Sequence, residues 1–435
     1  MADSADVAHL LRRTEFVVRP ARLSALTALS IDAAVDDVLN FVPNGATPLP
    51  GYLTYHDDDH GWEQYVYATN WWLEMMRDRP RPMQEKMTLF WHGHFTSAWS
   101  DIGRTDHMMH QNQLYRTQAL GNFRTLTQAM ALEPAMLVYL NNADNNKDSP
   151  NQNFARELME LFTLGVGNYT EDDVEASARA WTGHNAHWPD YTYQFIANNH
   201  DHGLKMFFGS NRNWNGPDII DEILRDNVAK RLIAARYITR KLWDFFAYPG
   251  GPANVINALA DVFVANNLEI KPLMKALLTR PEFYSAAAKQ GLVRTPTEYF
   301  VALSYHTGVS FDDLGPTWMG ERMGQELYNP PNVAGWKHNA AWLNTSALSA
   351  RAQLARSVTW HLRDNNGFGN VNAMSVAAAV DYVAAYFGMN ALSSTTRNAL
   401  IAAHTAERNA QAGSSWWAPT NLLTMTMLAP EFHMA

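Results

Sequence analysis

The sequence predicts a mainly α-helical protein with one small inserted β-hairpin. Apolar residues recur at helical spacing along most of the 435-residue chain, and Pro, Gly or Asn separates successive segments. A single stretch near residues 190–210 is instead rich in strand-forming and turn-forming residues. Neither an internal repeat nor a low-complexity run divides the chain. We therefore expect a single unit over residues 1–435, with 1–290 and 291–435 as the alternative division into two lobes.

Each predicted helix is a periodic segment with its own start or stop signal. Pro80 and Pro82 end the segment 61–78, and Thr170 is an expected N-cap with Asp173 three residues on. Pro150 and Gly165 bracket the segment 151–165 in the same way. The predicted helical segments are 5–13, 20–41 (two short helices), 61–78, 83–100, 107–131, 133–142, 151–165, 170–182, 218–247, 253–265, 270–279, 296–307, 346–362, 374–388, 392–411 and 416–428.

The hairpin prediction rests on two strand-forming runs around a polar turn. Residues 191–196 (YTYQFI) favour a strand, residues 198–203 (NNHDHG) favour a turn, and residues 204–208 (LKMFF) favour a second strand. We expect the two runs to pair with each other across the turn.

Composition excludes several classes of function. The formal net charge of -9 argues against nucleic-acid binding, which needs a basic surface. The absence of cysteine excludes disulfides, iron–sulfur clusters, thiolate zinc sites and a cysteine nucleophile. No window approaches the ~18 consecutive apolar residues of a membrane helix, so we expect no membrane insertion. Residues 1–13 lack the pattern of a secretory signal, which predicts a cytoplasmic location by default.

The helix predicted at 151–165 carries the first candidate site. Asn153, Arg156, Glu157 and Glu160 share one stripe at i, i+3, i+4 and i+7, opposite an apolar face. In one interpretation the stripe is solvated and Arg156 pairs with Glu160. In the other, which we favour, the stripe faces inward. Glu157 and Glu160 are then an acid–base pair, with Glu157 as the base, and Asn153 and Arg156 bind the substrate.

A second candidate site is the His92-Gly93-His94 segment. Two imidazoles on a kinked backbone can share a metal ion, and Gly93 permits such a kink. In a regular helix, however, positions i and i+2 point about 200° apart. The alternative is two core histidines, each satisfied by a hydrogen bond.

Two loops supply further candidates. Asp201 and Lys205 lie in the turn at 200–205, where Asp201 is a candidate metal ligand and Lys205 a candidate substrate contact, although Asx-turn bonding explains the turn equally well. Trp336 ends the Pro-rich loop at 329–336 and is a candidate ligand platform, although packing over the core is the alternative. The chain has no P-loop, G-x-G-x-x-G, G-x-S-x-G or H-E-x-x-H motif.

Several of these segments, in this order, resemble a bacterial family of unknown function, the domain-of-unknown-function family numbered 1800. The matching segments are 9–13 (HLLRR), 86–95 (KMTLFWHGHF), 119–124 (ALGNFR), 134–140 (PAMLVYL), 151–160 (NQNFARELME), 200–205 (HDHGLK) and 330–336 (PPNVAGW). The resemblance covers nearly the whole chain and implies a largely helical fold. It also implies a gene neighbour of the uncharacterised family numbered 1501, whose members resemble sulfatase-like proteins. Where this chain has Gln152 and Phe162, the family usually has Glu and His.

Two functions follow as hypotheses. In the first, the chain is an enzyme, a hydrolase or lyase, in which His94, Glu157 and Glu160 act on a hydroxyl-rich, glycan-like substrate. A divalent metal on His92, His94 and Asp201 would assist this reaction. In the second, the chain is a non-catalytic partner of the neighbouring sulfatase-like protein and is exported with it, and its polar clusters only hold the fold together.

Overall fold

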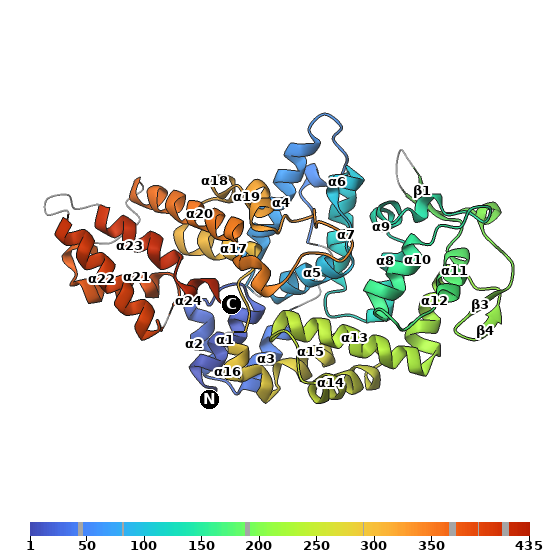
Figure 1. Ribbon diagram of the computed structural model, residues 1–435, viewed down its shortest axis with the longest axis horizontal. Coiled ribbons are helices and arrows are strands. Elements are labelled where there is room, and N and C mark those ends of the chain that lie inside the picture. The colour runs from blue at the N-terminus through green and yellow to red at the C-terminus, as the bar shows by residue number, and fades with distance from the viewer. Residues whose placement is uncertain are drawn as a thin grey trace.

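The structure, a computed structural model, describes residues 1–41, 47–80, 82–187, 192–289, 291–364, 371–389, 391–410 and 417–435. It confirms the mainly α fold class, with two small antiparallel sheets among the helices. The molecule is elongated, with a central group of helices, one group at each end and a base of helices below the centre (Figure 1). None of the helices in these ranges has the length and apolar content needed to cross a membrane.

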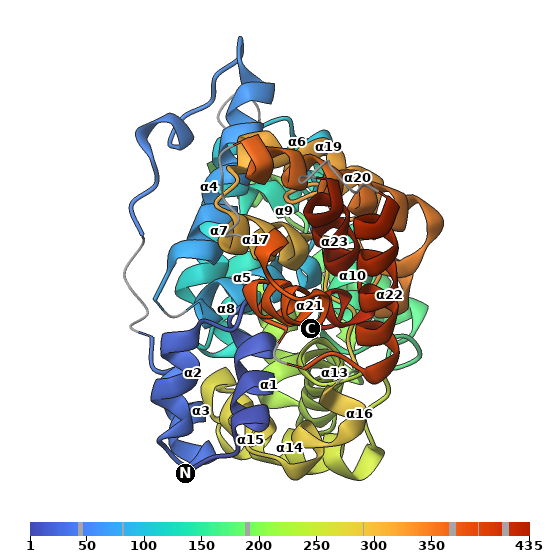
Figure 2. The same cartoon turned by 90° about the vertical axis from the view of Figure 1, so that its left-hand side faces the viewer.

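The base of the molecule joins the start of the chain to its middle. Helices α1–α3 pack beside α13–α16, although more than 180 residues of sequence separate the two sets (Figure 2). Asp3 and Ser30 cap α1 and α3 by accepting backbone N–H bonds, as short polar residues do at helix starts. These helices are α1 (Ser4–Thr14), α2 (Pro20–Thr27), α3 (Ile31–Leu39), α13 (Val228–Phe246), α14 (Ala253–Ala265), α15 (Ile270–Leu278) and α16 (Ala286–Lys289).

The centre and the two ends contain the other helices. At the centre, α4 (Gly61–Asp78), α5 (Met83–His94), α6 (Trp99–Ile102) and α7 (Thr105–Thr117) meet α17 (Pro296–Thr307), α18 (Phe311–Leu314), α19 (Pro316–Met323) and α20 (Thr345–Asp364). One end consists of α21 (Val376–Tyr386), α22 (Ser394–Ala410), α23 (Trp417–Met427) and α24 (Pro430–His433). The other contains α8 (Phe123–Ala131), α9 (Pro134–Tyr139), α10 (Asn153–Glu157), the π-helix η3 (Leu158–Thr163), α11 (Glu171–Ala180), α12 (Gly216–Asp221) and a second π-helix, η5 (Glu222–Asp226).

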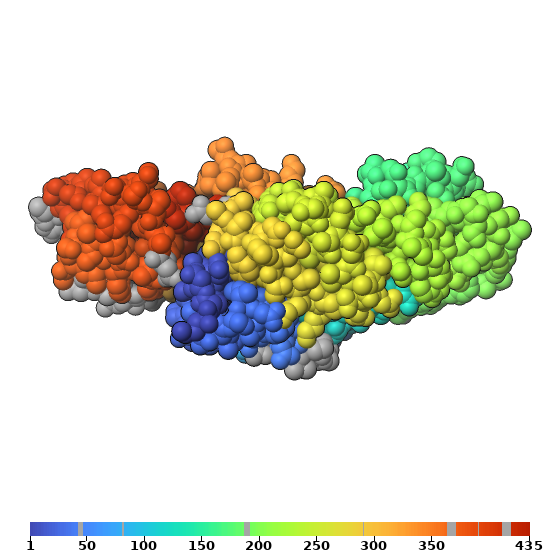
Figure 3. Space-filling view, turned by 90° about the horizontal axis from the view of Figure 1, so that it is seen from below, coloured from blue at the N-terminus to red at the C-terminus, as the bar shows by residue number. Residues whose placement is uncertain are grey.

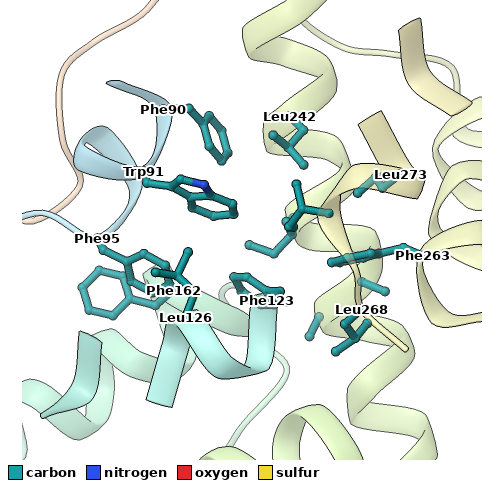
Figure 4. Packing of buried hydrophobic residues seen from close by; sticks show 14 of the residues in the cluster. Phe90, Trp91, Phe95, Phe123, Leu126, Phe162, Leu242, Phe263, Leu268 and Leu273 are labelled. Carbon is teal, nitrogen blue, oxygen red and sulfur yellow. The ribbon is translucent and has the colours of Figure 1, made fainter. Parts of the chain in front are cut away.

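Two apolar clusters form the interior, and α5 contributes to both. Its Phe90 and Trp91 belong to the first cluster, where Phe123, Phe162 and residues of α13 to α15 surround them (Figure 4). Leu89 of the same helix belongs to the second cluster, with α4 and α17 to α24. Because one helix is shared, we keep the single unit over residues 1–435 as a proposal.

The strands pair differently from the prediction. β1 (His184–His187) pairs with β2 (Thr192–Phe195), and β3 (Lys205–Phe207) pairs with β4 (Ser210–Arg212). The two predicted runs therefore belong to separate hairpins and do not pair with each other; Tyr191 lies outside the described residues. Phe208 and Gly209 both have positive φ (45° and 81°), which suits a two-residue hairpin turn directly after β3. This local turn supplies the partner of β3.

Candidate functional site

The predicted helix at 151–165 is helical but changes its period. α10 continues into the π-helix η3, in which backbone bonds run from residue i to i+5. Thr163 Oγ1 donates to Leu158 O (2.6 Å) within η3. Gly165 ends the segment with φ of +81°, and its N–H bonds Met159 O (3.1 Å). Because π-helical turns are rare and often occur at functional sites, this segment is a candidate functional site.

Side chains from other helices bind carbonyls near the end of η3. His94 Nε2 lies 3.0 Å from Phe162 O, and Tyr237 OH donates to Leu161 O (2.9 Å). A carbonyl only accepts, so the hydrogen of His94 is assigned to Nε2. Lys241 Nζ lies 3.5 Å from Leu161 O, and burial lowers its pKa to about 8. The end of the π-helix is therefore fixed to α5 and α13.

The polar stripe on this helix is half-buried to exposed. Glu157 and Glu160, which we call the carboxylate pair, are both half-buried, and Glu160 Oε2 accepts a hydrogen bond from Tyr169 OH. Arg156 forms a bidentate ion pair with Glu171 (2.8 Å) rather than with Glu160. Asn153 is exposed. The stripe thus faces a surface that water reaches.

The two carboxylates have different electrostatic surroundings. Burial and the neighbouring Glu160 raise the pKa of Glu157, against an opposing effect of Arg156. Burial and the bond to Glu160 raise the pKa of Tyr169 to about 12, so Tyr169 stays a hydrogen-bond donor at neutral pH. Burial, Asp101 and Glu157 also raise the pKa of Tyr139 to about 12. A proton is therefore held more tightly at Glu157 than at an ordinary glutamate, beside two protonated phenols.

His92 and His94 lie on different sides of α5. Because α5 is a regular α-helix up to His94, the two rings point apart. His92 Nε2 accepts from Tyr328 N (3.1 Å), and its ring packs against Trp72 and Trp336. His94 is 2% exposed and packs among Phe90, Phe95, Phe123 and Phe162.

Burial keeps both rings neutral. It lowers the pKa of His92 to about 3, and burial with the nearby Lys241 places the pKa of His94 well below its usual value. Among the described residues, no group of three or more His, Asp and Glu side chains is arranged to hold a metal. The structure does not bring His92, His94 and Asp201 together.

The polar side chains of the turn at 200–205 form hydrogen bonds within the turn and with neighbouring residues. Asp201 accepts from Arg179 Nε and Gly203 N (both 2.7 Å), which matches the Asx-turn alternative. Lys205 is buried, and its Nζ donates to the carbonyl oxygens of Asp201 and Gly203 and to Asn213 Oδ1 (3.2 Å). These contacts fix β3 to α11.

Trp336 is 4% exposed and packs against α5. Its ring lies 5.1 Å from that of His92, and a Cβ added at Gly93 would meet it at 3.5 Å. Gly335 has φ of +82°, and a Cβ there would lie 2.3 Å from Gly93 O, so only glycine fits. The glycine of the His-Gly-His segment therefore serves this close packing, and the Trp336 ring is enclosed by the protein.

Sequence reasoning missed the tyrosines of the site. Tyr139 ends α9 and Tyr169 precedes α11, so neither shares a helix with the carboxylate pair. A signal for Tyr139 existed, because it lies in the segment 134–140 that carried part of the family resemblance. Nothing in the sequence pointed to Tyr169.

Comparison with known proteins places this geometry in a family. A family model described as "Protein of unknown function (DUF1800)" matches residues 9–434. The chain belongs to the DUF1800 family. No curated protein and no solved structure matches it. The match spans all the segments on which the resemblance rested, and the carboxylate pair, the buried histidines and the Trp336 loop all lie within the matched residues of this DUF1800 member.

Proposed function

We propose that this DUF1800 protein is a hydrolase or lyase that uses the carboxylate pair for proton transfer. The observation that carries the proposal is the difference between the two carboxylates: Glu157 has a raised pKa, whereas Glu160 accepts a hydrogen bond from Tyr169. Pairs of titratable groups in different environments are typical of acid–base sites. In this role Glu157 takes a proton from water or from a substrate carbon, and Tyr169 holds Glu160 in place.

The neighbouring surface favours a hydroxyl-rich substrate. Trp62 on α4 is 52% exposed, and its ring lies 6.1 Å from Trp99 on α6. α6 packs against α9, which ends at Tyr139, and Asp101 of α6 acts on the pKa of that tyrosine. A run of ring faces and acidic groups thus leads towards the carboxylate pair. Aromatic faces with hydrogen-bonding carboxylates and phenols suit molecules that alternate C–H faces with hydroxyl groups.

A groove on α4 extends this surface. It has a volume of about 440 Å³ and is lined by Trp62, Tyr67, Trp71, Glu74 and Asp312, among others. Asn70 Nδ2 donates to Asp312 Oδ1 (2.5 Å), and burial raises the pKa of Glu74. The groove therefore offers both ring faces and acceptors, which supports a glycan-like substrate longer than one ring.

The test is turnover of a panel of neutral and acidic polysaccharides by the purified chain. Products of hydrolysis are measured as new reducing ends, and products of elimination as new ultraviolet absorbance. On the active substrate, Glu157→Gln is expected to lower kcat by about 10²-fold or more, the usual scale for losing a positioned acid or base. Glu160→Gln is expected to lower it as well. Repeating the assay after chelation, with and without added divalent metal, tests metal assistance.

Glu175→Gln is the matched control, because Glu175 is an exposed glutamate on the neighbouring helix α11. It is expected to keep wild-type turnover. If Glu157→Gln keeps both the wild-type melting temperature and wild-type turnover, the proposal fails. Co-purification with a sulfatase-like protein, unaffected by both carboxylate substitutions, would then favour the partner role.

A further inference from the structure

Four cations are buried around a single carboxylate where the N-terminal helix meets the end of the chain. Arg13, Lys86, Arg294 and Arg351, which we call the buried cation cluster, are 2%, 2%, 7% and 0% exposed. Glu298 of α17 acts electrostatically on all four of them. Four positive charges against one negative charge leave an excess of three. An uncompensated buried charge lowers the stability of the folded state, so a net positive charge in this cluster is unexpected without a bound anion.

The contacts within the cluster do not supply the missing negative charge. Both Glu298 oxygens are in use: Lys86 Nζ donates to Oε1, and Thr295 N donates to Oε2 (2.7 Å). Arg351 donates to Arg294 O (2.7 Å), and its Nη1 lies 2.8 Å from His433 Nδ1. Burial and the two arginines lower the pKa of His433 to about 3, so this ring is neutral. Carbonyls and a neutral ring satisfy hydrogen bonds but carry no net charge.

Several guanidinium N–H groups of the cluster have no hydrogen-bond acceptor among the residues that the structure describes. Nε and Nη1 of Arg13, Nη1 of Arg294 and Nε of Arg351 are buried without a hydrogen-bond partner within the described residues. The pKa of Arg13 is lowered to about 9 and that of Arg294 to about 10, mainly by burial; the positive charge of Arg12 contributes to both shifts, and Glu298 opposes them. Because such donors lose their bonds to water on burial, they normally find an acceptor.

A cavity lies directly beside this cluster. It has a volume of about 770 Å³ and lies between α1, residues 387–389 and 391–396, and the last residues of the chain; Arg12, Lys289 and Arg294 line it. Figure 3 shows the surface hollowed where the N-terminal helices (blue) approach the C-terminal helices (red). Lys289 pairs with Asp6 (2.6 Å). Arg12, by contrast, forms neither a hydrogen bond nor an ion pair in the described part of the chain. Glu431 and the last residue, Ala435, also line the cavity, and Glu431 accepts from Ser393 N (2.9 Å).

We propose that this cavity binds a phosphate or sulfate group through Arg12 and Arg294, with the other members of the buried cation cluster supplying positive potential behind them. A tetrahedral dianion matches the excess positive charge better than a single carboxylate does. The planar fork of a guanidinium also donates two parallel hydrogen bonds to such oxygens. The cavity exceeds the size of one ion and falls in the usual range for small-molecule sites, so it has room for an ester of the anion. The proposal does not depend on the carboxylate pair.

The test is isothermal titration of the full chain with inorganic phosphate, sulfate and glycerol 3-phosphate at constant ionic strength. Saturable binding of at least one of these anions is expected. Arg12→Gln is expected to weaken it about tenfold or more, the scale of one charge-assisted pair of hydrogen bonds. Tighter binding of glycerol 3-phosphate would identify the natural ligand as an ester, and equal or weaker binding would identify it as the free ion; both support an anion site.

Two controls keep the proposal falsifiable. Arg280→Gln removes an arginine that pairs with Glu282 away from the cavity, and it is expected to bind as the wild type does. Sulfate and phosphate also stabilise proteins without binding, but that effect does not saturate. Arg12 has no partner to lose, so Arg12→Gln is expected to fold even if Arg294→Gln does not. Absence of saturable binding by all three probes, or an unchanged affinity in Arg12→Gln, overturns the proposal.

Discussion

The carboxylate pair carries two negative charges at a surface that water reaches, whereas the buried cation cluster carries four positive charges in the interior around one glutamate. At the surface, like charges are tolerated because solvent and a phenol stabilise them, and the neighbouring Glu160 contributes to the raised pKa of Glu157. In the interior the pKa of Glu298 is shifted the other way. Burial raises it, but Lys86 and Arg294 outweigh burial and lower it. The sign of the pKa shift therefore distinguishes the half-buried Glu157, which has a like charge beside it, from the buried Glu298, which has cations around it.

Glu298→Gln is expected to have the largest effect on stability. It leaves the buried cations without a counter-charge, which costs about 3–5 kcal/mol when one partner of a buried ion pair is removed. Urea unfolding at pH 7 measures the loss. Glu282→Gln is the control, because Glu282 pairs with Arg280 near the surface and such pairs contribute about 1 kcal/mol or less. Equal losses in the two variants would contradict the comparison.

Tyr169→Phe tests the surface side of the comparison. It removes the hydrogen bond to Glu160 while keeping the ring, and it is expected to cost about 1 kcal/mol of unfolding free energy. If the carboxylate pair is catalytic, kcat should fall with little change in KM, because Tyr169 positions Glu160. Tyr237→Phe also removes one tyrosine hydroxyl, from Leu161 O, and it should lower stability without this selective effect on kcat.

The pH dependence of stability should have opposite signs in the two regions. The folded pKa of Glu298 is lowered, so its contribution is present above pH 4.5 and is lost as pH falls through the folded value. The stabilities of Glu298→Gln and the wild type should therefore converge in acid. The folded pKa of Glu157 is raised, so the wild type loses stability as pH rises from 4.5 through that value.

Glu157→Gln removes the carboxyl whose raised pKa makes the wild type lose stability as pH rises. Its effect on the free energy of unfolding should be the smallest of the series. Its stability relative to the wild type should increase as pH rises above 4.5, by less than the Tyr169→Phe effect. Thermal unfolding between pH 4 and 7 measures it. A flat difference between Glu157→Gln and the wild type would show that Glu157 ionises as it does in the unfolded chain.

The helical fold could be predicted from sequence because its signals are local. Pro150 and Gly165 marked the limits of the segment at 151–165, and Thr170 with Asp173 forms the expected capping box. The pairing of the strands could not be predicted, because the short turn at Phe208 and Gly209 outcompetes the longer polar turn before β3. The sequence rule for hairpins identifies strand-forming runs and turns, but it does not tell which of two candidate turns closes the strand pair.

The candidate site was predicted only in part for the same reason. The stripe with Glu157 and Glu160 followed from helical periodicity, but periodicity does not tell which face water reaches. The buried cation cluster was not predicted at all. Its members come from α1, α5, the residues before α17, and α20, and no spacing rule connects positions as distant as Arg13 and Arg351. A weak signal was available, since Arg13 and Lys86 both lie in segments that carried the family resemblance.

The π-helix η3 also limits how this segment can change in length. Deleting one residue between 158 and 163 would restore ordinary α-helical bonding, but it would rotate the preceding turn by about 100° relative to the following one. If the following turn kept its orientation, Glu157 would rotate off the face that it shares with Glu160. If the preceding turn kept its orientation, Phe162 and its carbonyl would rotate away from His94. The extra residue of the π-helix therefore sets the rotation between the turn that carries the carboxylate pair at the surface and the turn that packs against His94 in the core. Point substitutions can preserve that rotation, whereas an insertion or deletion here cannot.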